Sequence, residues 1–375
     1  MHLSFLRPLY ETAGPWASVY LDGTRNTEDA ATQVRLRWRA ARAALEMAGC
    51  GPATAGALEA TLLERPAGEG PQGLVAFAAG GRTALSRVLP APPRREIAAF
   101  GPLPHVMPLL AQLGESLPYV QVRVDRTGGD IEAVDAGRLV HTAEVEGRET
   151  FPLHRVKPGG WSQPRYQRAA HVTWQRNAGD VAAAVAEAAQ DCAAEVIVVA
   201  GDPQARPMLV ARLPEYWQER TVQTDIAAGA RAPGADHTAL DDVTVAAIAQ
   251  RAAANARVAF DRYHTQHGND AAGAGLPAVV AALQRGQADT VLLVDDPTST
   301  AELWIGPEPL QVSFDRAELL AMGVVNPQRV RADAALARAI ACSEADLLFA
   351  APEEVPAAGG VAAVLRYADA ATRRR

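Results

Sequence analysis

Hydrophobic positions along the chain follow two periods, one typical of strands and one typical of helices. Residues 17–21 form a short run with strand character. Between residues 33 and 47, apolar side chains instead recur every three or four positions, as on the buried face of a helix. The members of this face are Val34, Trp38, Ala41 and Leu45. Both periods in one chain predict a mixed α/β fold.

The first third of the chain continues with a hairpin and a short helix. Residues 74–78 and 83–89 are strand-like runs joined by a Gly-Gly turn at residues 80–81, which favours a β-hairpin. An apolar helix is expected over residues 106–113. We therefore predict an N-terminal α/β domain over residues 1–116.

The middle of the chain begins with three strand-like runs that follow one another closely, which predicts an antiparallel meander. These runs are residues 119–125, 130–136 and 139–145. The next expected elements are a helix over about 173–192, a strand over 196–200, a helix over 204–212 and a strand near 221–224. Three strands, helix, strand, helix and strand is the order of an RNase H-like sheet. We predict such a middle domain over residues 118–226.

The last third follows a stretch with the composition of a linker, residues 227–237. A long alanine-rich helix is expected over about residues 240–267. Shorter elements then alternate: helices over 277–285, 316–322 and 332–342, strands over 290–294 and 346–349, extended structure over 304–314, and a last apolar run over 361–367. This alternation predicts an α/β/α layered C-terminal domain over residues 238–375.

Composition agrees with three domains in a reducing compartment. The chain has 375 residues, too many for one ordinary core, and 49% of them are hydrophobic. Its three cysteines, Cys50, Cys192 and Cys342, are odd in number and far apart, which argues against a disulfide framework. We find neither a signal-peptide pattern nor a run long enough to span a membrane, so we expect a cytoplasmic protein without a membrane partner.

Positive charge is concentrated in residues 147–176, which we call the basic segment. It holds six basic residues and one acid, so its charge is +5, whereas the whole chain carries -7 and the remainder therefore -12. Lys157 is the only lysine of the chain. A basic, glycine-containing segment on an acidic protein is typical of a site that binds a polyanion.

The order of residues within the basic segment predicts an exposed finger. Pro158 and Pro164 bracket the tip and are expected to keep it out of the neighbouring helix and strand. Arg165 and Arg168, three residues apart, would share one face, and Trp161 and Tyr166 offer flat surfaces for stacking. The alternative is that the segment is only a solvated connection.

Residues 159–168, GGWSQPRYQR, resemble the middle-domain loop of the eukaryotic and archaeal class I release factor and Pelota superfamily. In that family a Gly-Gly-Gln tip is followed, after three residues, by Arg, an aromatic residue, one further residue and Arg. The positions that match without gaps are Gly159, Gly160, Ser162, Arg165, Tyr166 and Arg168. The chain is most similar to the bacterial branch, which includes Balon-like ribosome hibernation factors and relatives of the peptidyl-tRNA hydrolase of ribosome quality control.

The resemblance implies a fold and a set of partners. It implies an RNase H-like middle domain and, because residues 283–296 are also similar, a C-terminal domain like kink-turn-binding ribosomal proteins. It further implies binding in the ribosomal A site beside ribosomal RNA and the P-site tRNA, with the elongation GTPase Tu as a further partner, and a role in ribosome hibernation or rescue. The charge of the basic segment, its aromatic residues and the resemblance together predict these residues for RNA binding: Arg155, Lys157, Gly159, Gly160, Trp161, Ser162, Gln163, Arg165, Tyr166 and Arg168.

One position departs from the family pattern. Trp161 stands where the family has its catalytic glutamine, and the nearest glutamine, Gln163, follows two residues later. An indole offers one donor and no acceptor, so Trp161 cannot replace an amide. This departure favours a binding protein over an enzyme. The alternative is a peptidyl-tRNA hydrolase in which Gln163 positions a water against the ester.

Other candidate chemistry is sparse. Asp125 and Asp130 flank a Gly-Gly hairpin, where acids usually solvate the turn, although a two-metal nuclease is the alternative. His264 and His267 have a spacing seen in metal sites but lack a third ligand in the sequence. No phosphate-cradling glycine motif is present. We therefore predict neither a metal nor a cofactor. The family resemblance implies RNA, and not DNA, as the nucleic acid.

Overall fold

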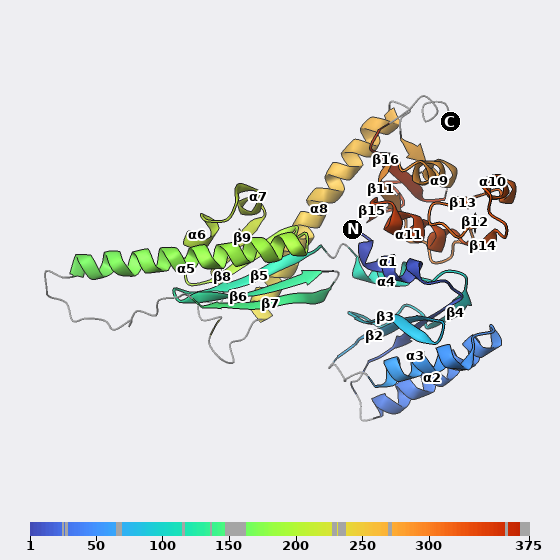
Figure 1. Cartoon of the computed structure of the whole chain (residues 1–375), viewed down its shortest axis with the longest axis horizontal. Helices are drawn as coiled ribbons and strands as arrows, with labels where there is room; N and C mark the ends of the chain where they lie inside the picture. Colours follow the sequence, from blue (N-terminus) through green and yellow to red (C-terminus); the bar gives the residue numbers. More distant parts are fainter. Residues whose placement is uncertain are drawn as a thin grey trace. The chain divides into compact units, whose positions relative to one another are not determined.

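The structure is a computed structural model. It describes residues 1–24, 26, 29–64, 70–114, 117–135, 137–146, 163–226, 231, 238–268, 272–356 and 359–367, and of residues 163–174 it describes the backbone alone. The chain divides into two compact units (Figure 1). Unit 1 comprises Met1–Gly114 with Val258–Arg375, and unit 2 comprises Glu115–Arg257.

Unit 2 is built on one five-stranded sheet with the strand order β7-β6-β5-β8-β9. Its strands are β5 (Tyr119–Val124), β6 (Gly128–Asp135), β7 (Arg138–Glu146), β8 (Val196–Gly201) and β9 (Thr221–Gln223). The first three pair antiparallel as a meander, and β8 and β9 add to β5 in parallel. This is the sheet expected for an RNase H-like domain.

Helices cover both faces of the β8 strand, which explains why its sequence is apolar without alternation. On one face, Ile197 and Val199 pack in a cluster with Val181 and Val185 of α5 (Gln163–Asp191). On the other face, Val196, Val198 and Ala200 pack with Leu240 of α8 (Thr238–Gly268). The remaining helices of unit 2 are α6 (Ala205–Val210) and α7 (Glu215–Gln218).

Helix α5 begins about ten residues earlier than the sequence predicted. We expected a helix from about residue 173, and we expected Pro164 to keep the preceding segment out of it; both expectations were wrong, because α5 starts at Gln163. Pro164 is its second residue. Proline is tolerated there because the first N–H groups of a helix have no partner inside the helix.

In unit 1 the N-terminal part forms an antiparallel sheet with the order β3-β2-β1-β4. Its strands are β1 (Trp16–Asp22), β2 (Gly73–Ala79), β3 (Arg82–Leu89) and β4 (Ile97–Gly101). Helices α2 (Ala30–Met47) and α3 (Pro52–Leu63) cover one face, where Val34, Trp38 and Leu45 pack with Val19 and Leu21. The predicted helical face and hairpin are confirmed, whereas α3 and β4 were not predicted.

The C-terminal part of unit 1 contains two further sheets, with the orders β10-β16-β11-β15 and β13-β12-β14. Their strands are β10 (Gly273–Ala274), β11 (Ala288–Leu293), β12 (Glu302–Ile305), β13 (Val312–Ser313), β14 (Gln328–Arg331), β15 (Asp346–Phe349) and β16 (Val361–Leu365). The helices are α9 (Leu276–Gln284), α10 (Arg316–Ala321) and α11 (Ala332–Cys342). The predicted mixed α/β class is thus confirmed.

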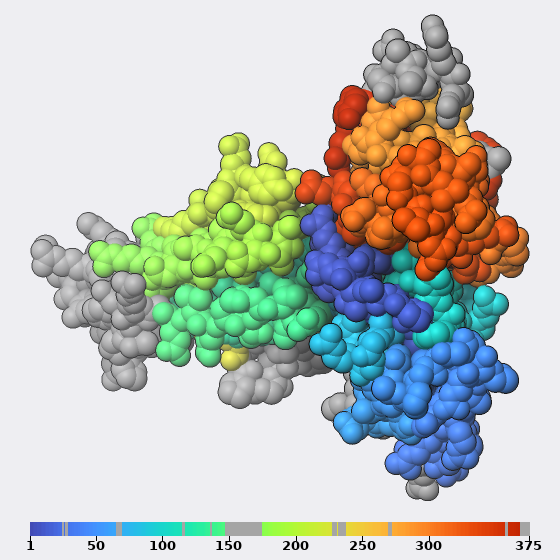
Figure 2. Space-filling view, turned by 45° about the vertical axis from the view of Figure 1, so that its right-hand side comes forward, coloured from blue at the N-terminus to red at the C-terminus, as the bar shows by residue number. Residues whose placement is uncertain are grey.

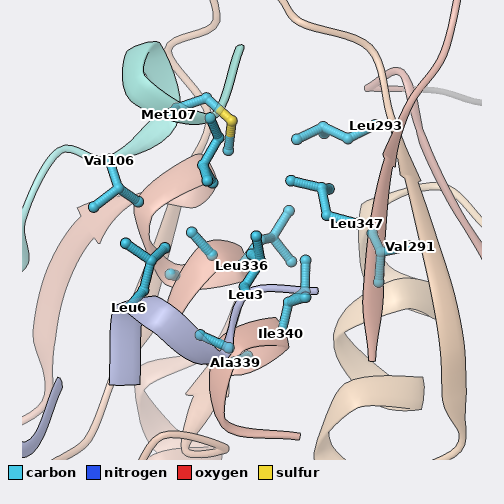
Figure 3. Packing of buried hydrophobic residues seen from close by; sticks show 14 of the residues in the cluster. Leu3, Leu6, Val106, Met107, Val291, Leu293, Leu336, Ala339, Ile340 and Leu347 are labelled. Atoms are coloured by element: carbon cyan, nitrogen blue, oxygen red, sulfur yellow. The ribbon is translucent and has the colours of Figure 1, made fainter. Parts of the chain in front are cut away.

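The N-terminal and C-terminal parts of unit 1 share one hydrophobic core (Figure 3). Leu3 and Leu6, from the start of the chain and η1 (Ser4–Leu6), pack with Leu336 and Ile340 of α11. The same cluster takes in residues of α1 (Arg7–Glu11) and α4 (Met107–Leu113). Figure 2 shows the dark-blue N-terminal residues against the orange and red C-terminal ones. The division into three domains stays a prediction. Residues 1–114 of its first member and 258–375 of its third belong to one compact unit, whereas residues 238–257 belong to unit 2.

His105 lies in this shared region and predicts a pH-dependent stability. Burial lowers the pKa of His105, and the nearby Arg331 and Arg95 lower it further against the opposing effect of Asp333. Its Nδ1 is buried without a hydrogen-bond partner. Because the folded state favours the neutral ring, the unfolded chain binds the proton more readily below its own pKa of about 6.5.

We therefore expect the free energy of unfolding of the protein to fall as the pH drops from about 7 to 5. His105→Gln is expected to flatten this dependence, as measured by urea unfolding at a series of pH values. His141→Gln, at an exposed position of β7, is the matched control and should keep the wild-type slope. Equal slopes in wild type and His105→Gln would contradict the assignment.

Candidate nucleic-acid interface

The basic segment follows the edge strand β7, which ends at Glu146, and its second part, from Gln163 onward, belongs to α5. Ten residues were expected to bind RNA, and the structure places four of them, Gln163, Arg165, Tyr166 and Arg168, in the first two turns of α5. The other six, Arg155, Lys157, Gly159, Gly160, Trp161 and Ser162, lie outside the described residues. The described part of the expected interface therefore lies at the beginning of one long helix.

Helix α5 is anchored far from its first residue. It has 29 residues, which corresponds to roughly 43 Å. Val181, Val185 and Ala189 bury their side chains in the core of unit 2. Arg168 lies about 20 Å along the helix axis before Val181, and Arg165 about 24 Å. The sheet thus fixes the direction of a helix whose arginines lie well away from the anchoring contacts.

The start of α5 adds a favourable field for anions. The first N–H groups of a helix have no partner inside the helix, and its N-terminus carries a partial positive charge of roughly +0.5. Phosphate groups bind at such ends. Positions 165 and 168 lie about one turn apart along the backbone of the helix. The arrangement suits a chain of phosphates better than a single small anion.

A second cluster of charges surrounds Arg231. Its guanidinium contacts Asp130 at 2.9 Å, Asp125 at 3.1 Å and Glu144 at 3.3 Å, with 13% of the arginine side chain exposed. Burial alone raises the pKa of Asp125, but hydrogen bonds from Thr127 and the nearby Arg231 hold it below its usual value. Arg231 comes from the segment that composition marked as a linker, and sequence reasoning missed it.

These contacts decide how the acids beside the Gly-Gly hairpin act. Asp130 is also 3.8 Å from Arg123, and Arg123 pairs with Glu132 at 2.6 Å. In the described part of the chain, no three His, Cys, Asp or Glu side chains are arranged to hold a metal ion. The carboxylates beside the hairpin therefore pair with the arginines Arg123 and Arg231.

Replacing Arg231 is expected to destabilise unit 2. Arg231→Met leaves three neighbouring carboxylates without their shared cation, and we expect a loss of about 1–3 kcal/mol in the free energy of unfolding at pH 7. The loss should shrink as the pH falls below about 4, because protonated carboxyls no longer repel. Urea unfolding measures both. Glu144→Gln, at the most exposed of the three partners, should change stability much less; equal losses would contradict the arrangement.

His264 and His267 lie near the end of α8 and contact an aromatic ring. The His267 ring stacks on Tyr263 with 5.6 Å between ring centroids, and His264 lies tilted at the same distance. Tyr263 itself is 2% exposed. The two histidines therefore pack against a buried tyrosine.

Among the helices described, none is long and apolar enough to cross a bilayer.

Comparison with known proteins finds a family match for the region that contains the basic segment. Residues 118–269 match the family model of bacterial archaeo-eukaryotic release factor family 2. The chain is also 28% identical over 367 residues to the uncharacterized protein Rv2629 of Mycobacterium tuberculosis strain H37Rv, which covers 97% of this chain and 96% of that protein. The same identity and coverage are found for the uncharacterized protein MT2704 of strain CDC 1551.

Solved structures with similarity to the chain include release factors and Pelota proteins. The archaeal translation termination factor aRF1 is 16% identical, with 97% of this chain and 96% of that chain covered and a TM-score of 0.25. Dom34 of S. cerevisiae is 11% identical, with 80% and 82% covered and a TM-score of 0.35. Residues 118–269 are thus similar to bacterial archaeo-eukaryotic release factor family 2, and the predicted resemblance to a bacterial release factor-like family is confirmed over this region.

Proposed function

We propose that this protein binds the A site of the ribosome and acts there as a hibernation or rescue factor. The basic segment would contact ribosomal RNA beside the P-site tRNA. Within it, Arg155, Lys157, Arg165 and Arg168 would bind phosphates, and Trp161 and Tyr166 would stack on bases or riboses, with the backbone of Gly159, Gly160 and Ser162 approaching closely. The elongation GTPase Tu as a further partner, and a cytoplasmic location, belong to the same proposal.

The observation that carries the proposal is the family match over residues 118–269, which contains the whole basic segment. The geometry of α5 supports it, because the helix begins inside that segment and is anchored on the sheet by its second half. A rigid support lowers the entropy that is lost when a binding group is ordered. The matched region thus combines a fixed helix end with a charge of +5 over residues 147–176.

The charge distribution also supports binding to RNA over other partners. Phosphate contacts release counterions from RNA and make the affinity depend steeply on salt. The remainder of the chain carries -12 and is repelled by RNA, so the basic segment is favoured as the point of contact. Selectivity would then come from the shape of the ribosomal site more than from base sequence.

The single lysine of the chain offers a direct test. A reagent with an amine-reactive ester at one end and a photoactivated diazirine at the other is attached to Lys157, and the protein is irradiated on ribosomes. We expect cross-links to ribosomal RNA at the A site. Lys157→Arg keeps the charge and leaves the terminal amine as the remaining reactive group, so it is the matched control. Identical cross-links from both proteins, or none to RNA, would contradict the proposal.

A second candidate function, peptidyl-tRNA hydrolysis, is favoured by the position of Gln163. This residue is the first of α5, beside the unpaired N–H groups of the helix end. Such donors can stabilise an oxyanion that develops at the ester carbonyl, while the Gln163 amide positions the attacking water. The position of Gln163 in the sequence weighs against hydrolysis, because it lies two residues beyond the family's catalytic glutamine. A shift of only ~1 Å in a positioning group can cost about 100-fold in rate.

Ribosomes that carry a labelled peptidyl-tRNA in the P site separate the two functions. The binding function predicts that saturating protein releases no peptide above the rate without protein. Release that is lost in Gln163→Ala and retained in Trp161→Ala would establish the hydrolase. Both variants keep the full charge of the basic segment, so a sedimentation assay in parallel shows that each still binds.

A further inference from the structure

Unit 1 contains a cavity of about 810 Å³. One part of its lining comes from Leu9, Trp16 and Phe100, and another from Ile305 and Val324. Cavities of 300–1,000 Å³ with mostly apolar walls and a few polar groups are typical of small-molecule sites. The size and lining of this cavity therefore fit a small organic ligand.

Arg338 is the one charged residue among the described residues that line the cavity. It belongs to α11 and is 5% exposed. Its Nη1 donates a hydrogen bond to the carbonyl of Gly306 at 3.0 Å, and its Nη2 donates a longer one, 3.4 Å, to the carbonyl of Gln311. Its Nε is buried without a partner. The guanidinium thus contacts neutral acceptors alone.

No carboxylate in the described part of the chain lies within 4.0 Å of the Arg338 guanidinium, which sets it apart from the ion-paired arginines of the same unit. Arg331, the last residue of β14, pairs with Asp333 at 2.6 Å, and Arg37 pairs with Asp22 at 3.1 Å. Burial lowers the pKa of Arg338 against the opposing effects of Tyr10, Cys342 and Glu308, the last of which is outside ion-pair distance, yet a guanidinium stays protonated in proteins. A buried charge without a counter-ion costs free energy that an incoming anion offsets.

A second polar group beside the cavity lacks a partner. Tyr10 of α1 lines the cavity, and its hydroxyl is buried without a hydrogen bond. The pKa of Tyr10 is raised far above its usual value, mainly by burial, with Arg338 acting in the opposite direction. The tyrosine and the arginine are thus two buried polar groups at the cavity, whose lining also includes Thr12, Gln311, Asn326 and Gln328.

We propose that this cavity binds a small organic anion, whose carboxylate or phosphate pairs with Arg338 and whose apolar body packs against Trp16, Phe100 and Val324. The planar guanidinium keeps N–H groups unused by the two carbonyls, and such groups suit the oxygens of either anion. The proposal is independent of ribosome binding, because every lining residue belongs to unit 1 and the basic segment belongs to unit 2.

Two fluorescent probes of nearly the same shape test the charge requirement. The sulfonate 8-anilinonaphthalene-1-sulfonate carries an anion on an apolar body, and N-phenyl-1-naphthylamine is its uncharged counterpart. We expect the full chain to bind the sulfonate more tightly than the amine. Arg338→Met should weaken sulfonate binding about tenfold or more and leave the amine unchanged. Equal sulfonate affinity in wild type and Arg338→Met would overturn the proposal.

A second variant keeps the test decisive if Arg338→Met fails to fold. Ala13 lines the cavity yet is exposed, so Ala13→Trp is expected to fold and to fill part of the space. It should abolish binding of both probes. Ala40→Trp, at an exposed position of α2, is the matched control and should retain it. Retention of sulfonate binding in Ala13→Trp would contradict the site.

Competition distinguishes the two head groups. Benzoate and phenyl phosphate are each titrated against the bound sulfonate probe, and the stronger competitor identifies the preferred anion. Benzyl alcohol, which has the ring without the charge, should compete at least tenfold more weakly than the better anion. Failure of both anions to displace the probe, or equal displacement by the alcohol, would overturn the assignment of Arg338 as the anion-binding group.

Discussion

Replacing Arg165 and Arg168 together by alanine is expected to weaken ribosome binding on the order of 30-fold near 0.15 M salt. Both residues lie in the first two turns of α5, within the region that matches the release factor family. Each phosphate contact adds nearly one to the slope of log affinity against log salt, so losing two should reduce that slope by about two. Co-sedimentation with ribosomes over a salt series measures the affinity and the slope together.

The matched control for this variant lies on α2. Arg35 and Arg39 are exposed, four residues apart on one helix, and belong to unit 1. Replacing both by alanine removes the same charge from the protein outside the basic segment. We expect a slope close to that of wild type. If the two double variants lose affinity and slope equally, then net charge governs binding and the basic segment has no special role.

Leu6→Ala is expected to lower the stability of the N-terminal and C-terminal parts of unit 1 together. Leu6 is fully buried and packs in the core that also contains Leu336 and Ile340. Removing a buried leucine side chain costs about 3 kcal/mol, which corresponds to roughly 6–12 °C in the melting temperature for a unit of this size. Calorimetry gives the shift.

Hydrogen exchange then tests whether the two parts respond as one. We expect amides of β2, near the N-terminus, and of β11, near the C-terminus, to exchange faster by similar factors in Leu6→Ala. Leu36→Ala, at a position that is 46% exposed on α2, is the control and should leave both rates unchanged. Faster exchange confined to β2 would show that the two parts do not share a cooperative core.

The local pattern of apolar residues was sufficient to predict a helix where one of its faces is buried and the other is solvated. The face of α2 that contains Val34 and Trp38 was predicted because its apolar positions keep the helical period. Helix α3 was missed because Ala, Gly and Thr fill most of its positions and give little contrast between faces. The start of α5 was missed because Pro164 was interpreted as a stop, although a proline in the first turn begins a helix.

Contacts between distant segments could not be predicted from the same patterns. The packing of Leu6 against Ile340 joins residues more than 300 positions apart, and amphipathicity shows that a residue is buried without showing its partner. For the same reason Arg231 was treated as part of a linker, and Arg338 as one more residue of a helix. The basic segment, in contrast, could be singled out from the sequence alone, by its excess of basic residues and by the order of residues 159–168.

The central claim, that the basic segment contacts ribosomal RNA in the A site, is tested most directly by a cryo-EM map of the protein bound to ribosomes. The account predicts density for residues 147–176 in the A site, with the side chains of Arg165 and Arg168 within hydrogen-bond distance of RNA phosphates. A map in which the protein binds elsewhere on the ribosome, or in which this segment faces away from RNA, would contradict it.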